Sequence, residues 1–241
     1  MADLQLSTLA IARLSERFTE VGKRDRWTQP ASELQAQLRA VGWPCSAAVL
    51  STEEAFGDWP HPSGEVFGVY ASLRYIRGEV EWDRGENDYG HLRDNPLYDA
   101  EKMLPLWFHD SPWIWLGLDG SIYYGYNEEY REYFTHAFVD AAHYWEVLAL
   151  LDGGIVDYCP RVFFPRRPRL EADGFVGSAL AKELGLEAFA PASRGKTLAW
   201  TGAGATVVEL DIPGFLRGTV ATFDEVEGVV LAASCALDLA K

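Results

Sequence analysis

The sequence lacks the signals of secretion, membrane insertion and disulfide bonding. Its first eighteen residues have neither the basic start nor the unbroken apolar centre of a signal peptide, and no run reaches the roughly 18 apolar residues that span a bilayer. The three cysteines, Cys45, Cys159 and Cys235, are odd in number, far apart and without CxxC spacing. This spacing argues against a disulfide framework and a structural zinc site. We therefore expect a cytoplasmic protein that holds neither a metal nor a cofactor.

Signatures of catalysis are also missing. No GxxxxGK[ST] motif occurs, and the Gly202-Ala203-Gly204 segment lacks the further glycine of a dinucleotide-binding fingerprint. His109, Asp110 and Ser111 supply the residue types of a hydrolase triad. Neighbours in sequence, however, cannot normally form the chain of nucleophile, base and orienting group. The first expectation is that the chain is not an enzyme.

Basic side chains are few relative to acidic ones. The 36 acidic and 21 basic residues leave a formal net charge of −15. A charge of this sign repels phosphate backbones and anionic lipids, so nucleic acid and membrane surfaces are excluded as expected partners. It would attract a basic protein such as a cationic nuclease, or it could serve solubility alone. The sequence gives no indication of the oligomeric state.

Apolar residues make up 48% of the chain, enough for a substantial core. Apolar spacing over 4–21 predicts an amphipathic helix that Gly22 ends. A second helix is expected from Ser32, as its N-cap, to Gly42.

The middle of the chain is expected to form β-structure. The Val-, Ile- and Tyr-rich stretch 65–82 predicts antiparallel strands. Residues 79–101 include eight acidic side chains, and beyond the strand end at Trp82 this segment predicts a mobile loop. Two β-rich runs meet at Asp119-Gly120 and predict a hairpin. A helix is then expected from an N-cap at Asp140 to Gly153-Gly154.

A second, smaller α+β unit is expected beyond a connecting loop over 155–173. We predict a helix over 177–186, two strands around Gly202–Gly204, and a helix that starts in the capping box of Thr222 and Glu225. The expected fold class is α+β, an antiparallel sheet with flanking helices. The expected domains are 1–154 and 155–241.

The two parts share a weak internal similarity. An alignment of the chain with itself that places Trp115 on Trp200 also places Gly117 on Gly202 and Phe138 on Phe223, without a gap. We call it the repeat alignment. The order of hairpin, long connection, phenylalanine and capped helix also recurs. Both an ancient duplication and the chance recurrence of a common pattern explain this similarity.

Histidines supply an alternative, enzymatic hypothesis. On one continuous helix, His136, Asp140 and His143 would share a face at i, i+4 and i+7, as in a set of two histidines and one carboxylate that binds a metal. Because Asp140 is also a good N-cap, His136 is expected to precede the helix and point elsewhere. The alternative is an enzyme of unrecognised class whose site lies around these residues and His109.

The expected partner-binding surface combines acidic side chains with tyrosines that strand alternation places on an outer face. Its members are Glu79, Glu81, Asp83, Glu86, Asp88, Tyr89, Asp94, Tyr124, Tyr126 and Tyr130.

Part of the chain resembles the SUKH superfamily. The run MLPLWFHDSPWIWLGLDGSIYYGY, followed by FVDAAHYWEVLALL, is similar to the second half of such a domain, and the helix before Gly42 is similar to the region that precedes its sheet. The likeness covers about residues 30–151. It implies an α+β fold with a central antiparallel sheet and a non-enzymatic role, often that of an immunity protein or antitoxin that binds a toxin. No catalytic residues are carried over.

Overall fold

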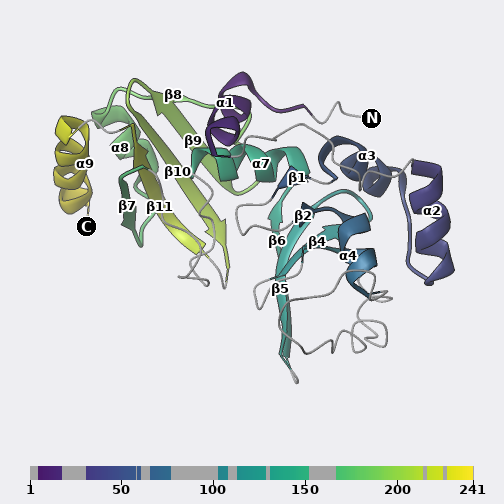
Figure 1. Ribbon diagram of the computed structural model, residues 1–241. Coiled ribbons are helices and arrows are strands. Elements are labelled where there is room, and N and C mark those ends of the chain that lie inside the picture. Colours follow the sequence, from purple (N-terminus) through teal and green to yellow (C-terminus); the bar gives the residue numbers. More distant parts are fainter. Residues whose placement is uncertain are drawn as a thin grey trace. The chain divides into compact units, whose positions relative to one another are not determined.

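The computed structural model describes most of the chain (Figure 1). The described residues are 5–17, 31–57, 59–60, 66–76, 103–107, 113–128, 131–151, 167–213, 216–224 and 227–240. They form helices and two larger antiparallel sheets, which confirms the α+β fold class. No helix within these ranges is long and apolar enough to cross a lipid bilayer.

The first larger sheet has four strands in the order β3-β4-β5-β6. They are β3 (Met103–Trp107), β4 (Trp113–Gly117), β5 (Ile122–Glu128) and β6 (Arg131–Phe138). The expected hairpin at Asp119-Gly120 is confirmed, because β4 and β5 pair on either side of this turn. Gly120 has a φ of 92°, which an L side chain rarely adopts, and the Asp119 carboxylate accepts a hydrogen bond from the Ser121 amide at 2.9 Å.

Three helices and a short strand pair precede this sheet. They are α2 (Ala31–Ala40), α3 (Ala47–Phe56), β1 (Trp59–Pro60), β2 (Val66–Phe67) and α4 (Val69–Ile76). Helix α2 confirms the second expected helix, although it begins at Ala31, so Ser32 lies in its first turn and not at the N-cap. Helix α3 was not expected, yet the Ser46 hydroxyl is an ordinary N-cap that accepts a hydrogen bond from the Val49 amide.

The prediction of strands over 65–82 is wrong for most of its described part. Only Val66–Phe67 is a strand, and α4 follows at once. The buried carboxylate of Glu53 accepts hydrogen bonds from the Val69 and Tyr70 amides at 2.8 and 3.2 Å, which satisfies the first turn of the helix. This distant cap favours helix over the β-rich local composition. The expected turn at Arg77-Gly78 lies outside the described residues.

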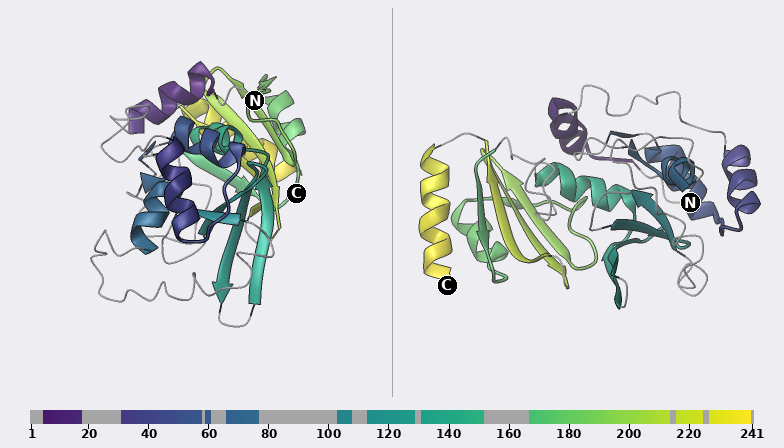
Figure 2. Two further views of the ribbon diagram at one scale, coloured as in Figure 1. Left: turned by 90° about the vertical axis from the view of Figure 1, so that its right-hand side faces the viewer. Right: turned by 60° about the horizontal axis from the view of Figure 1, so that its bottom comes forward.

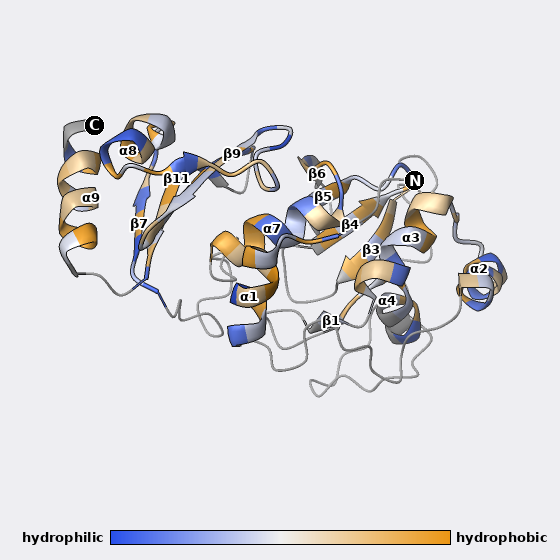
Figure 3. Ribbon diagram, turned by 90° about the horizontal axis from the view of Figure 1, so that it is seen from above, coloured by the Kyte–Doolittle hydropathy of each residue, from blue (hydrophilic) through white to orange (hydrophobic). Residues whose placement is uncertain are grey.

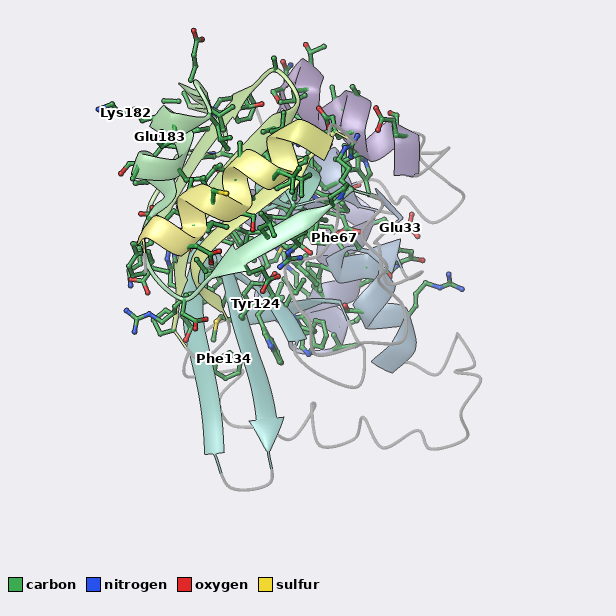
Figure 4. All side chains as sticks on the ribbon, turned by 90° about the vertical axis from the view of Figure 1, so that its left-hand side faces the viewer. Glu33, Phe67, Tyr124, Phe134, Lys182 and Glu183 are labelled. Carbon is green, nitrogen blue, oxygen red and sulfur yellow. The ribbon has the colours of Figure 1, made fainter. Side chains whose placement is uncertain are left out.

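The second larger sheet has five strands in the order β7-β11-β10-β9-β8. They are β7 (Arg169–Ala172), β8 (Glu187–Ala188), β9 (Thr197–Gly202), β10 (Ala205–Ile212) and β11 (Leu216–Phe223). Helices α8 (Gly177–Glu183) and α9 (Glu227–Ala240) cover one face, where Val207, Ala221 and Phe223 are fully buried (Figure 2). Lys182 and Glu183 of α8 point away from this sheet into solvent (Figure 4).

Two expectations in this region are corrected. Residues 169–172 were expected to be loop but form β7, because Leu170 and Ala172 pack into the core beside β11. Thr222 was expected to cap a helix but lies within β11, opposite Thr206, and its hydroxyl donates to the Leu150 carbonyl at 3.0 Å. The following helix begins only at Glu227.

Two further helices pack against each other. They are α1 (Thr8–Arg17) and α7 (Ala141–Leu150), and both match expected helices. Asp140 is the N-cap of α7, as predicted, and its carboxylate accepts a hydrogen bond from the His143 amide at 2.8 Å. All ten residues of α7 are buried. The helix also contacts β10.

The internal similarity extends to the topology. Strands β3-β4-β5-β6 are followed by α7, and strands β8-β9-β10-β11 are followed by α9. In the repeat alignment, β6 and β11 coincide from end to end and both finish on a fully buried phenylalanine. The hairpin registers differ slightly, because Trp115 faces Tyr123 whereas Trp200 faces Val207. A shared order of four strands and a helix supports the duplication hypothesis.

The chain divides into two compact units that are not the two repeats. One consists of residues 1–4 and 20–134, and the other of residues 5–19 and 135–241. The second unit therefore contains α1 and α7 as well as the five-stranded sheet. The predicted domains, 1–154 and 155–241, have different limits and stay a prediction.

Candidate functional site

Most of the expected partner-binding residues lie outside the described residues. This holds for Glu79, Glu81, Asp83, Glu86, Asp88, Tyr89, Asp94 and Tyr130. The backbone of Tyr126 lies in β5, but the position of its side chain is not described. At these positions the acidic surface stays a prediction.

Tyr124 does not belong to an exposed surface, which corrects the expectation for this residue. It lies on β5, next to Ile114 of β4, and only 1% of it is exposed (Figure 4). Ile114, Leu116 and Ile122 share its face of the sheet and are equally buried. Alternation along β5 directs the half-buried Tyr123 to the opposite face, where it pairs with Trp115. Trp115 in turn makes an edge-to-face contact with Phe134 at 5.2 Å.

The described members of the histidine hypothesis do not form a metal site. His136 is exposed on β6, whereas His143 is fully buried on α7, and His109 lies outside the described residues. The Nε2 atom of His143 lies 3.1 Å from the Ala192 carbonyl, and its Nδ1 atom accepts from the Val139 amide at 3.4 Å. Burial lowers the pKa of His143 to about 4. His143 is therefore a neutral anchor whose two ring nitrogens are both engaged.

Asp140 is engaged as well. Besides capping α7, its carboxylate forms a two-pronged ion pair with the Arg194 guanidinium, at 3.0 and 2.5 Å. Together with the bond from His143 to Ala192, this pair holds the 192–194 segment against the start of α7. Among the described residues, no group of histidine, cysteine or carboxylate side chains is arranged to hold a metal ion. These contacts make a structural clasp within the second unit.

A second clasp fastens α1 to α7. The Glu146 carboxylate, 3% exposed, accepts hydrogen bonds from the amide and hydroxyl of Ser7, and the Ser7 hydroxyl in turn accepts from the Ala10 amide. Ser7 is thus the N-cap of α1. Burial raises the pKa of Glu146, and the bonds from Ser7 oppose that rise.

Arginines complete the second clasp. The buried Arg13 of α1 donates to the Leu150 carbonyl at the end of α7, at 3.5 Å, and lies 3.8 Å from Asp224. Arg167 bridges Asp224 and Glu16. A positively charged guanidinium at a helix C-terminus interacts favourably with the helix dipole. These contacts involve residues far apart in sequence, and we find no local motif that could have identified them.

The large exposed apolar side chains of the described residues all belong to the second unit. Four large hydrophobic residues are prominently exposed within the described ranges, namely Ile11, Phe175, Leu198 and Leu231. Leu231, on α9, is 63% exposed, more than the other three. Most of α9 has the hydrophobic colours of Figure 3. Because large exposed apolar side chains favour contacts with other molecules, α9 is the best described candidate for a binding surface.

Comparisons with known proteins do not add a relative. No family model, no curated protein and no solved structure matches this chain.

Proposed function

We propose that this protein is a cytoplasmic binding module that neutralises a basic protein, such as a toxic nuclease, by covering its active surface. The observation that carries the proposal is the distribution of charge. Residues 1–4 and 20–134 contain 21 acidic and 10 basic side chains, whereas residues 5–19 and 135–241 contain 15 and 11. An acidic excess accelerates encounter with a cationic partner and disfavours nucleic acid.

Two further features agree with this role. The resemblance to the SUKH superfamily implies an immunity or antitoxin function and an antiparallel sheet, and strands β3 to β6 form such a sheet. In addition, His143 and Asp140 serve as structural anchors, so no specific observation favours the enzymatic alternative.

The test is binding to the protein encoded beside its own gene. The two proteins are co-expressed, and capture is measured at about 0.05 M and about 0.5 M salt, because screening weakens attraction between exposed charges. Glu79→Gln with Glu81→Gln is compared with Glu183→Gln and Glu187→Gln, exposed residues of the second unit. Both double variants remove two negative charges.

We expect capture of a basic, growth-inhibiting protein, weaker at high salt and weaker for the first variant than for the second. Failure to capture any protein would refute the proposal. Capture that depends on neither salt nor these carboxylates would refute its electrostatic basis.

A further inference from the structure

Helix α9 presents an apolar face to solvent as well as to the core. Ala233 and Leu237 point into the core cluster beneath the helix. The opposite face is exposed and consists of Gly228, Leu231, Ala232, Cys235 and Asp238. Spacings of three and four residues place these side chains on one side of the helix. We call these five residues the outer face of α9. A helix that is apolar all round is typically covered on both sides.

The equivalent helix of the first repeat shows what covers such a face. In the repeat alignment, Leu231 corresponds to Glu146 and Cys235 to Leu150. Both α7 residues bind helix α1, because the Glu146 carboxylate accepts a hydrogen bond from Ser7 and the Leu150 carbonyl accepts one from Arg13. The covering element is therefore a short amphipathic helix. It buries small and branched apolar residues, Ala10 and Leu14, and its Arg13 donates to the Leu150 carbonyl at the end of α7.

The charge of α9 also favours a short amphipathic helix that carries a basic residue. Between Glu227 and Ala240 there is no basic side chain, and Lys241 follows the helix in sequence. Asp238 is exposed near the C-terminal end of the helix. The carbonyl groups at a helix C-terminus add partial negative charge at that end. A cationic side chain near Asp238 would be attracted to both, as Arg13 is placed at the end of α7.

We propose that the outer face of α9 docks an amphipathic helix of the basic partner. The apolar residues of that helix pack around Leu231, and an arginine or lysine lies against Asp238. This inference rests on the proposed function for the identity of the partner. It places the apolar part of the contact on α9.

The probe for this surface is a labelled synthetic peptide of residues 5–17, since this segment is the helix that covers α7. Its binding to the full chain is measured by fluorescence anisotropy at low salt. We expect Leu231→Asp to weaken binding about tenfold, as expected for a central apolar contact, and Asp238→Asn to weaken it about threefold. Leu198→Asp, a change at another exposed leucine of the second unit, is the matched control and should leave binding unchanged.

Three results would overturn the inference. The peptide does not bind, it binds equally well to the Leu231→Asp variant, or light scattering shows a wild-type dimer that Leu231→Asp converts to a monomer. In the last case a second copy of the chain covers the outer face.

Capture of the basic protein by the wild type and by the Leu231→Asp variant distinguishes this inference from the proposed function. Equal capture by wild type and by Leu231→Asp refutes docking on α9 and leaves neutralisation standing. Peptide binding that depends on Leu231, without any basic partner, supports the docking surface and refutes neutralisation.

Discussion

Helices α7 and α9 follow equivalent four-strand meanders and differ in what surrounds them. Every residue of α7 is buried, whereas five residues of α9 form an exposed face. Helix α7 contacts α1 and β10, and α9 contacts helix α8 and the strands β7 and β11. Both helices are rich in apolar residues. The two helices are therefore alike in apolar composition and differ in burial, because their neighbours differ.

At two matching positions the covered helix carries a polar side chain where α9 does not. His143 and Glu146 of α7 correspond to Gly228 and Leu231 of α9 in the repeat alignment. The two polar side chains can be buried because each has hydrogen-bond partners, which offset the cost of removing them from water. They also fix which segment lies on the helix, because only correctly placed donors and acceptors satisfy them. A purely apolar contact on the outer face of α9 would require no such placement of hydrogen-bond donors and acceptors.

The largest expected effect is the loss of packing on α7. Leu150→Ala should lower the free energy of unfolding by about 3 kcal/mol, because Leu150 is fully buried and the change leaves a cavity. Its carbonyl still accepts the bonds from Arg13 and Thr222, so the effect reports on the side chain. Urea unfolding followed by circular dichroism measures it. A loss below about 1 kcal/mol would show that α7 is not tightly covered.

The next effect concerns pH and His143. The unfolded chain protonates this histidine near pH 6.5, whereas its pKa in the folded protein is about 4. Between these values the unfolded state binds a proton that the folded state does not, so the free energy of unfolding falls as the pH falls. The free energy of unfolding falls by about 3 kcal/mol in total, and this loss is complete below pH 4. Urea unfolding between pH 7 and pH 4 measures it.

A variant isolates this contribution from other titrating groups. His143→Gln keeps a donor for the Ala192 carbonyl but cannot be protonated, so its stability should fall less steeply than that of the wild type. Glu146 remains in both proteins, and its raised pKa acts in the opposite direction, favouring the folded state as the pH falls. Parallel slopes for the wild type and the His143→Gln variant would contradict the buried, neutral state of His143.

A smaller effect is expected at the ion pair of α7. Arg194→Met should cost about 1 kcal/mol, because it removes a two-pronged bond to the N-cap residue Asp140. Arg217→Met is the matched control, since its pair with Asp211 is more exposed and should contribute less than about 0.5 kcal/mol. Equal losses of stability, measured by urea unfolding, would show that the pair adds nothing beyond a surface contact.

Local sequence signals predicted the features of the fold that depend only on neighbouring residues. The Asp119-Gly120 hairpin needs a positive φ that glycine supplies, and the Asp140 cap needs a carboxylate within reach of the first helical turn. Both requirements can be seen in a few consecutive residues. For this reason the fold class and the position of α7 could be predicted.

The errors arose where a distant group determined the local structure. Helix α4 depends on Glu53, which lies 16 residues before the amide of Val69 that it accepts from. Thr222 resembles a helix cap in sequence, yet pairing with β10 and a bond to the Leu150 carbonyl keep it in a strand. The clasp between Asp140 and Arg194 spans 54 residues. Composition and spacing carry no information about such partners.

The smallest expected effect completes the comparison of the two helices. Leu231→Ala applies the same substitution as Leu150→Ala to the other helix, but Leu231 is 63% exposed, so little packing is lost. Alanine also has a slightly higher helix propensity than leucine, so the free energy of unfolding should change by less than about 0.5 kcal/mol. Urea unfolding of the isolated chain measures this. A loss near that of Leu150→Ala, at a protein concentration at which the wild type is monomeric, would mean that the outer face of α9 is covered within its own chain and is not available to a partner.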